Sequence, residues 1–196
     1  LSSASATRGI YHTYSGGVPT TGTYTASLDN NTITLTTTAS PTFECMRMSA
    51  AASLISGVTH SMSNNTLLNC STAGTFVGFL HGNSVIGTLN INGNVIRGTT
   101  VSGTSAGLTG IRNTVAILSA ININNNQIGN ASGGAVTFTA ATSGAFLGIS
   151  NEAAQTTIPL SITGNDFRGI TYNVASSGSN TYIINTAASL SQNISN

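Results

Sequence analysis

Apolar and polar positions repeat along this chain at intervals typical of one coil of a solenoid. In five segments an asparagine lies three residues after one aliphatic residue and two residues before another apolar one. These anchor asparagines are Asn31, Asn65, Asn94, Asn126 and Asn165. Successive anchors are 34, 29, 32 and 39 residues apart, so a constant motif alternates with connections of variable length. A unit this short cannot bury its own apolar face, and we expect successive units to stack on one another.

The residues around each anchor predict columns of stacked side chains. In a parallel β-solenoid each coil pairs with the coils above and below, about 4.8 Å away, so equivalent positions lie over one another. We expect two interior columns, one from the residues before the anchors (Leu28, Met62, Ile91, Ile123, Ile162) and one from those after them (Ile33, Leu67, Ile96, Ile128, Phe167). The anchors should form a structural ladder in which each amide bonds to the next amide and to the turn. Asparagine also tolerates the left-handed backbone of a sharp corner.

A second motif keeps the same phase. Gly78, Gly110 and Gly148 lie between apolar residues, 16, 16 and 17 residues before the next anchor. Between the motifs, stretches such as 85–91 and 115–121 often alternate apolar and polar side chains, which is the period of a half-buried strand. Thr, Ser, Asn, Gly and Ile dominate the repeated segments and are poor or mediocre helix formers. The pattern therefore predicts an all-β fold built as a solenoid.

The repeat divides the chain into a leading segment and five coils. Residues 1–27 are interpreted as a partial first coil or a capping or linking segment, and the coils are assigned to residues 28–61, 62–90, 91–122, 123–161 and 162–193. The last three residues resemble the start of the segment at Met62, so the chain is interpreted as a section of a longer one.

Composition narrows the class of partner. Charged residues are 5% of the chain, against roughly a quarter in ordinary soluble domains, and lysine is absent. The five arginines and four acids give a formal charge of +1, far from the basic stripe that phosphate binding requires, which argues against nucleic acid as a partner. A periodic hydrophobic fraction of 39% argues against disorder. No segment approaches the ~20 apolar residues of a membrane span.

Cysteines and histidines are few. Cys45 and Cys70 lie in different phases, 14 and 5 residues after their anchors, and different phases predict different sides of the solenoid. Two small buried side chains are therefore favoured over a disulfide. His12, His60 and His81 fall at unrelated phases without an acidic partner at metal-ligand spacing. Neither a zinc site nor a nucleophilic triad is predicted.

Three phrases carry a resemblance to a known family. Leu-Asn-Ile-Asn-Gly-Asn-Val-Ile-Arg-Gly (89–98), Ile-Asn-Ile-Asn-Asn-Asn-Gln-Ile (121–128) and Leu-Ser-Ile-Thr-Gly-Asn-Asp-Phe-Arg-Gly (160–169) resemble the rungs of right-handed parallel β-helices of the pectate-lyase-like type. More narrowly, the chain resembles the giant Ser/Thr/Asn-rich β-strand-repeat surface proteins of Bacteroidetes, which are adhesin-like or filament-like. The resemblance implies an extracellular structural or adhesive role. With the repeat pattern, it predicts an all-β, right-handed parallel β-helix of about five to six coils.

The four carboxylates are few and dispersed, which argues against polysaccharide cleavage. Hydrolysis requires two carboxyl groups about 5 to 9.5 Å apart, and lyase chemistry a carboxylate cluster with a base. The chain has only Asp29, Glu44, Glu152 and Asp166. At about 4.8 Å per coil, the two aspartates are about 19 Å apart along the axis and the two glutamates about 14 Å, which leaves only Asp29 with Glu44 and Glu152 with Asp166. We predict no catalytic residues, no cofactor and no metal.

Two patterns suggest ligand-binding surfaces. Arg97 and Arg168 each follow an anchor by three residues, and two coils, about 10 Å, would separate them. They are a candidate patch for an anion or acidic sugar, or two solvated turn residues. Threonines alternate in 32–38 and 137–142, as in the flat arrays with which ice-binding solenoids order water. The unequal coil lengths argue against such an array, unless one face stays regular while loops vary on another.

These observations predict a non-catalytic structural or adhesive segment of a secreted filament or fibre protein, located outside the cell or on its surface. The expected partners are further coils of the same chain or identical subunits in a filament, and cell-surface glycans are candidate ligands. Two alternatives stay open. One is a β-helix protein that binds or cleaves polysaccharide, and the other is an ice-binding solenoid.

Overall fold

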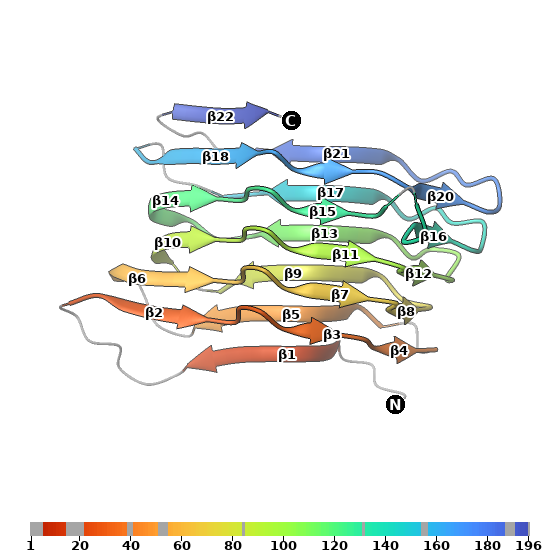
Figure 1. The fold of residues 1–196 in the computed structure, drawn as a ribbon, viewed down its shortest axis with the longest axis horizontal. Helices are drawn as coiled ribbons and strands as arrows, with labels where there is room; N and C mark the ends of the chain where they lie inside the picture. Colours follow the sequence, from red (N-terminus) through yellow and green to blue (C-terminus); the bar gives the residue numbers. More distant parts are fainter. Residues whose placement is uncertain are drawn as a thin grey trace.

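The structure is a computed structural model, and it describes residues 6–14, 22–38, 41–50, 55–83, 85–130, 132–153, 157–186 and 191–195. All regular elements in these residues are β-strands, and every strand pairing among them is parallel. The strands stack as a β-solenoid of about five turns (Figure 1). The all-β, parallel solenoid predicted from the repeat is confirmed.

Each turn contributes one strand to each of four sheets. Two strands lie outside the complete turns, β1 (Thr7–Tyr14) before them and β22 (Ser191–Ser195) after them. The first and second turns contain β2 (Tyr24–Ser27), β3 (Thr32–Ile33), β4 (Thr36–Thr37), β5 (Phe43–Ala50), β6 (Ile55–Ser61), β7 (Thr66–Leu68), β8 (Ser71–Thr72) and β9 (Phe76–Gly82). The other three contain β10 (Ile86–Asn90), β11 (Val95–Arg97), β12 (Thr100–Val101), β13 (Leu108–Asn113), β14 (Ile117–Asn122), β15 (Gln127–Ile128), β16 (Val136–Phe138), β17 (Phe146–Asn151), β18 (Pro159–Thr163), β19 (Asp166–Phe167), β20 (Ile170–Tyr172) and β21 (Asn180–Asn185).

The four sheets run the length of the stack. We name them sheet A (β1-β5-β9-β13-β17-β21), sheet B (β2-β6-β10-β14-β18-β22), sheet C (β3-β7-β11-β15-β19) and sheet D (β4-β8-β12-β16-β20). In Figure 1 the chain runs left to right along sheets B and C in front, returns right to left along sheet A behind, and climbs with each turn. This path is a right-handed coil, as the resemblance implied.

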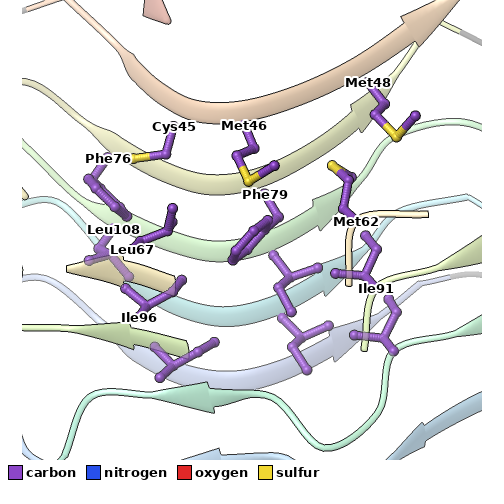
Figure 2. Packing of buried hydrophobic residues seen from close by; sticks show 14 of the residues in the cluster. Cys45, Met46, Met48, Met62, Leu67, Phe76, Phe79, Ile91, Ile96 and Leu108 are labelled. Atoms are coloured by element: carbon purple, nitrogen blue, oxygen red, sulfur yellow. The ribbon is translucent and has the colours of Figure 1, made fainter. Parts of the chain in front are cut away.

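Apolar side chains fill the interior in columns. Ile33, Leu67, Ile96, Ile128 and Phe167 are register partners along sheet C, and all but the half-buried Phe167 are buried. The residues before the anchors stack in the same way, with Leu28 half-buried and Met62, Ile91, Ile123 and Ile162 fully buried. Figure 2 shows Met62 next to Ile91 and Leu67 next to Ile96. Equivalent positions in successive coils therefore meet one another inside the solenoid.

The phased glycines lie where sheet A approaches the core of sheet C. A Cβ on Gly78 would lie 2.6 Å from Ile96 Cδ1, and a Cβ on Gly110 would lie 2.3 Å from Ile128 Cδ1. Gly148 has the same relation to Phe167, whose Cε1 would be 2.4 Å away. The space that a side chain would need at these positions is filled from the opposite sheet, which explains why glycine recurs in step with the anchors.

Differences in coil length fall in the connections. Val95 and Thr100 are five residues apart, whereas their register partners Gln127 and Thr137 are ten apart. The five additional residues lie between β15 and β16, and the strands on both sides keep their pairing. Unequal anchor spacing is therefore compatible with regular sheets.

The close approach of sheets A and C can be tested at Gly110. A methyl group there would collide with Ile128 Cδ1 and lie 2.6 Å from the carbonyl oxygen of Gly148, so Gly110→Ala should destabilise the protein by roughly 1–3 kcal/mol. Gly82→Ala is the matched control, because its Cβ would meet only Thr114 Oγ1, at 3.2 Å. Urea denaturation measures both variants. Equal midpoints would contradict the proposed packing.

Candidate functional site

The corner between sheets B and C depends on a left-handed residue directly before each anchor. The residues at this position are Asn30, Asn64, Gly93, Asn125 and Gly164, with φ between 56° and 65°. The left-handed residue therefore directly precedes the anchor, whereas the left-handed conformation was predicted for the anchor itself. Only asparagine or glycine occupies the position, in agreement with the steric cost of positive φ for other residues.

The five anchors form a continuous ladder of amides. Asn94 shows its pattern: its Oδ1 accepts from Asn65 N at 2.9 Å and Asn65 Nδ2 at 3.0 Å. Its own N and Nδ2 donate to Asn126 Oδ1, both at 2.9 Å, and Nδ2 also donates to the carbonyl oxygen of Met62 at 2.8 Å. Equivalent bonds join Asn31 to Asn65 and Asn126 to Asn165.

The ladder satisfies polar groups that the corner would otherwise bury without a partner. Asn65, Asn94 and Asn126 are at most 1% exposed, so water does not reach their amides. Leaving a buried backbone N–H unpaired costs about 1–3 kcal/mol. Each coil thus needs the amide of the next coil to complete its turn.

A second, outer ladder lies two residues before the anchors, and the sequence analysis missed it. Asp29 Oδ1 accepts from Ser63 N at 2.6 Å, and Asn92 Oδ1 accepts from Asn124 N at 2.8 Å. Asn124 Oδ1 in turn accepts from Thr163 N at 2.9 Å. These bonds point down the axis, opposite to the inner ladder. A polar side chain at this offset in all five units was the available signal.

A third polar column runs along the inner side of sheet A. Asn113 Nδ2 donates to Asn151 Oδ1 at 2.8 Å, and Asn151 Nδ2 donates to Asn185 Oδ1 at 2.9 Å. His81 is the register partner of Asn113 and contacts its Oδ1 through Nδ1 at 2.9 Å. His81 Nε2 lies 3.0 Å from Nδ1 of His60 on sheet B.

The prediction that the histidines occupy unrelated phases is wrong for His12 and His81, which share one column, whereas His60 is on another sheet. His81 stacks in the column of Asn113 and Asn151, and through Met48 this column continues to His12. The histidines of sheets A and B meet because these sheets face each other across the core, a relation that spacing along the chain does not express. A signal was present, since Gly78, Gly110 and Gly148 are each followed three residues later by a member of this column.

Both imidazoles of the buried pair are neutral near pH 7. Burial lowers the pKa of His60 to about 3, with a smaller contribution from His81. Burial also lowers the pKa of His81 to about 4, against the effect of its bond to Asn113. Because Asn113 Oδ1 can only accept, His81 donates from Nδ1 and accepts from His60 at Nε2. The pair therefore continues the hydrogen-bonded column and is structural.

The two cysteines are buried without a disulfide and lie on different sides of the coil, as expected. Cys45 on sheet A and Cys70 beside sheet D are both fully buried free thiols. Their side chains are close enough across the interior to influence each other's pKa, and the Cys70 thiol donates to the carbonyl oxygen of Ile33 at 3.7 Å. Phase along a flattened coil assigned them to different sheets, but the inner faces of those sheets meet in the core. Burial raises the pKa of the Cys45 thiol well above its usual value, so this thiol is protonated and unreactive.

Each carboxylate already has partners. Glu44 accepts from Arg8 Nε at 2.6 Å and from Arg47 Nη1 at 3.0 Å. The hydrogen bond from Arg112 lowers the pKa of Glu152, and that from Arg168 lowers the pKa of Asp166. Asp29 belongs to the outer ladder.

The two carboxylate pairs left open by the spacing lie on different elements. Asp29 is at the corner after sheet B and Glu44 is on sheet A, while Glu152 follows sheet A and Asp166 is on sheet C. No group of three or more His, Cys, Asp or Glu side chains that could hold a metal occurs among the described residues.

The two arginines of the candidate patch differ in their ion pairing. Arg97 and Arg168 both follow the sheet C core column by one residue, two coils apart. Arg168 Nε donates to Asp166 Oδ1 at 2.7 Å, so its charge is balanced within its own coil. Arg97 is exposed and has no ion pair in the part of the chain that the structure describes.

Shallow hollows follow the connection between sheets D and A. One of them is lined by residues 73–75 and 102–106, which are Ala, Gly, Thr and Ser. A neighbouring hollow is lined by Thr104, residues 141–143 and residues 175–177. None of these lining residues carries a charge or an aromatic ring, so the Ser and Thr hydroxyls of the hollows have no general base among the lining residues to activate them.

Comparison with protein-family models, curated proteins and solved structures finds no match for this chain. Among the described residues, no helix is both long and apolar enough to cross a membrane.

Removing one amide should interrupt the ladder. Asn94→Ala removes the acceptor of the buried Asn65 N–H and one of the two acceptors of Asn65 Nδ2, and we expect a loss of about 3 kcal/mol or more. Asn92→Ala is the control, because Asn92 is half-buried and water can replace the acceptor that Asn124 N loses, at a cost of about 1 kcal/mol. Urea unfolding curves separate the two. A larger loss for Asn92→Ala would refute the role of the inner ladder.

The histidine pair should make stability sensitive to acid. The unfolded histidines titrate near pH 6.5 whereas the folded ones titrate at about 3 and about 4, so the unfolded chain binds more protons and stability falls as pH drops from 6.5 towards 4. His60→Leu combined with His81→Asn matches the neighbours in register, Leu89 and Asn113. The double variant should lose less stability over this interval in urea unfolding measured at several pH values. Parallel pH profiles for the two proteins would disprove the role of the pair.

Proposed function

We propose that this chain is a non-catalytic rod segment of an extracellular or cell-surface structural or adhesive protein. Its coils would stack on further coils of the same chain or on identical subunits. The observation that carries the proposal is the ladder of amides, which joins all five anchors in one line of hydrogen bonds.

Hydrogen bonding along one direction supports a mechanical role. The backbone bonds between successive coils run along the axis, as they do in any parallel sheet stacked in this way. The inner and outer ladders and the column of Asn113 and Asn151 add side-chain bonds in the same direction. Because each coil contacts mainly its neighbours, stability accumulates with the number of coils.

The state of the acidic residues supports a non-catalytic role. Glu44, Glu152 and Asp166 are paired with arginines, and Asp29 accepts bonds from the next coil. Pairing with arginine holds the pKa of Glu152 and of Asp166 below the usual range, whereas a general acid needs a raised pKa. Polysaccharide cleavage would have to recruit a group that already has a structural partner.

Exposed apolar groups at one edge of the stack support the proposed partners. Tyr182 on β21 is 50% exposed and Ile194 on β22 is 43% exposed. Ile194 is the register partner of the buried Ile162, so it continues the interior column. Open strand edges with apolar side chains favour pairing with another chain. A further coil would cover this edge.

The resemblance to Bacteroidetes surface proteins supports the location. Such proteins are secreted, and their Ser-, Thr- and Asn-rich rungs share the composition of this chain. The absence of lysine and the 5% charge content of this chain therefore fit a location outside the cell better than a cytosolic one.

Association through the open edge is the test of the proposal. Ile194→Lys would place a charge over the interior column, so it should prevent the concentration-dependent end-to-end association that we expect of the unmodified chain. Asn193→Lys is the matched control, because Asn193 pairs with the outward Ser161. Sedimentation velocity and electron microscopy measure association. A chain that stays monomeric at all concentrations, or association unaffected by Ile194→Lys, would refute stacking through this edge.

A further inference from the structure

Sheet D presents two outward columns of small hydroxyl side chains. Parallel pairing aligns one residue of each strand in the first column, and these residues are Thr36, Ser71, Thr100, Thr137 and Thr171. Two residues later the chain again points outward, and the second column consists of Thr38, Ala73, Ser102, Thr139 and Asn173. Eight of these ten positions carry a hydroxyl group.

The residues between the two columns point inward and hold the sheet on the core. Thr72, Val101 and Phe138 are at most 1% exposed. Phe138 stacks on Tyr172 of the next coil, with ring centroids 4.5 Å apart and planes 5° from parallel. The outward side chains are therefore carried by strands whose positions are fixed from below.

Sheet D stays regular where coil lengths differ. The five additional residues of the fourth turn lie before β16, and Thr100 remains paired with Thr137. The objection that unequal coils prevent a flat array therefore does not apply to this sheet. Of the two threonine stretches noted in the sequence, 137–142 begins on sheet D, whereas 32–38 is divided between sheets C and D.

Among the described residues, no charged side chain lies on the outward face of sheet D or in the hollows that begin at its second column, where Ala73 and Ser102 line the wall. Arg8, Glu44, Arg47 and Arg112 are instead on sheet A, and Asp166 and Arg97 are on sheet C. The face also lacks an aromatic platform of the kind that sugar rings stack on, because Tyr172 is turned inward against Phe138. A polar, uncharged and periodic surface remains.

We propose that the outer face of sheet D binds ice. Its hydroxyls repeat about every 4.8 Å between coils and about every 6.6 Å between the two columns, since a strand rises about 3.3 Å per residue. Threonine is stiff at χ1, so its hydroxyl and methyl groups keep nearly the same positions along a column. A rigid array repeating in two directions fits a ligand that is itself a lattice, and crystalline water is such a ligand.

Ice recrystallisation and ice shaping test this proposal. The unmodified chain should inhibit recrystallisation and should shape single crystals. Thr100→Lys combined with Thr137→Lys introduces two long charged side chains at the centre of the array, so it should raise the minimum inhibitory concentration at least tenfold. Thr66→Lys is the matched control, since Thr66 is also a half-buried outward threonine but lies on sheet C. Circular dichroism and thermal melting verify that both variants are folded.

Two results would overturn the assignment. An unmodified chain without effect on ice is the first, and equal activity of the Thr100/Thr137 and Thr66 variants is the second. A third result would identify the face as a glycan-binding surface instead. The unmodified chain would then have no effect on ice but would bind an insoluble polysaccharide, and only the Thr100/Thr137 variant would lose this binding. The proposal is independent of assembly, because the Ile194→Lys variant should retain its effect on ice whether or not the unmodified chain associates.

Discussion

Each coil has to turn a sharp corner after sheet B without burying an unpaired backbone N–H. A left-handed residue makes the turn, and the N–H of the anchor that follows points along the axis, beyond the reach of its own coil. The side-chain amide of the next coil's anchor accepts this hydrogen bond. The same contact keeps the neighbouring core residue of that coil in register. Local geometry and long-range stacking are thus satisfied by one interaction, which makes the fold collective.

The polar columns also give the solenoid a direction. Inner-ladder amides donate towards the C-terminal coils, as in Asn94 to Asn126, whereas the outer ladder donates the opposite way, as in Asn124 to Asn92. The His81–Asn113–Asn151 column follows the direction of the inner ladder. A neighbour that continues all three columns must therefore be added head to tail, which is the heterologous arrangement that produces filaments rather than closed dimers.

The repeated anchors and core positions could be predicted from the sequence, whereas the side-chain contacts between opposite sheets could not. The anchors and their aliphatic neighbours were readable because fixed offsets within one corner place them in the same environment in every coil. The contact between His60 and His81 joins opposite sheets, and its existence depends on the cross-section of the coil, which spacing along the chain does not contain. For the same reason, the proximity of the Cys45 and Cys70 side chains was not predicted. Glycine at 78, 110 and 148 was visible as a pattern, but its cause, the side chains of sheet C, required the structure.

Separation of the ladder from the outer faces leaves those faces free to differ. The ladder and core columns use inward positions and the B–C corner, whereas the paired hydroxyl residues of sheet D use outward positions outside the ladder. Additional residues between β15 and β16 change neither the ladder nor the pairing on both sides. A substitution on the outer face of sheet D is therefore expected to leave the ladder and the core columns intact. The proposed structural role and the proposed recognition role are consequently compatible in one solenoid, because they are assigned to different sets of residues.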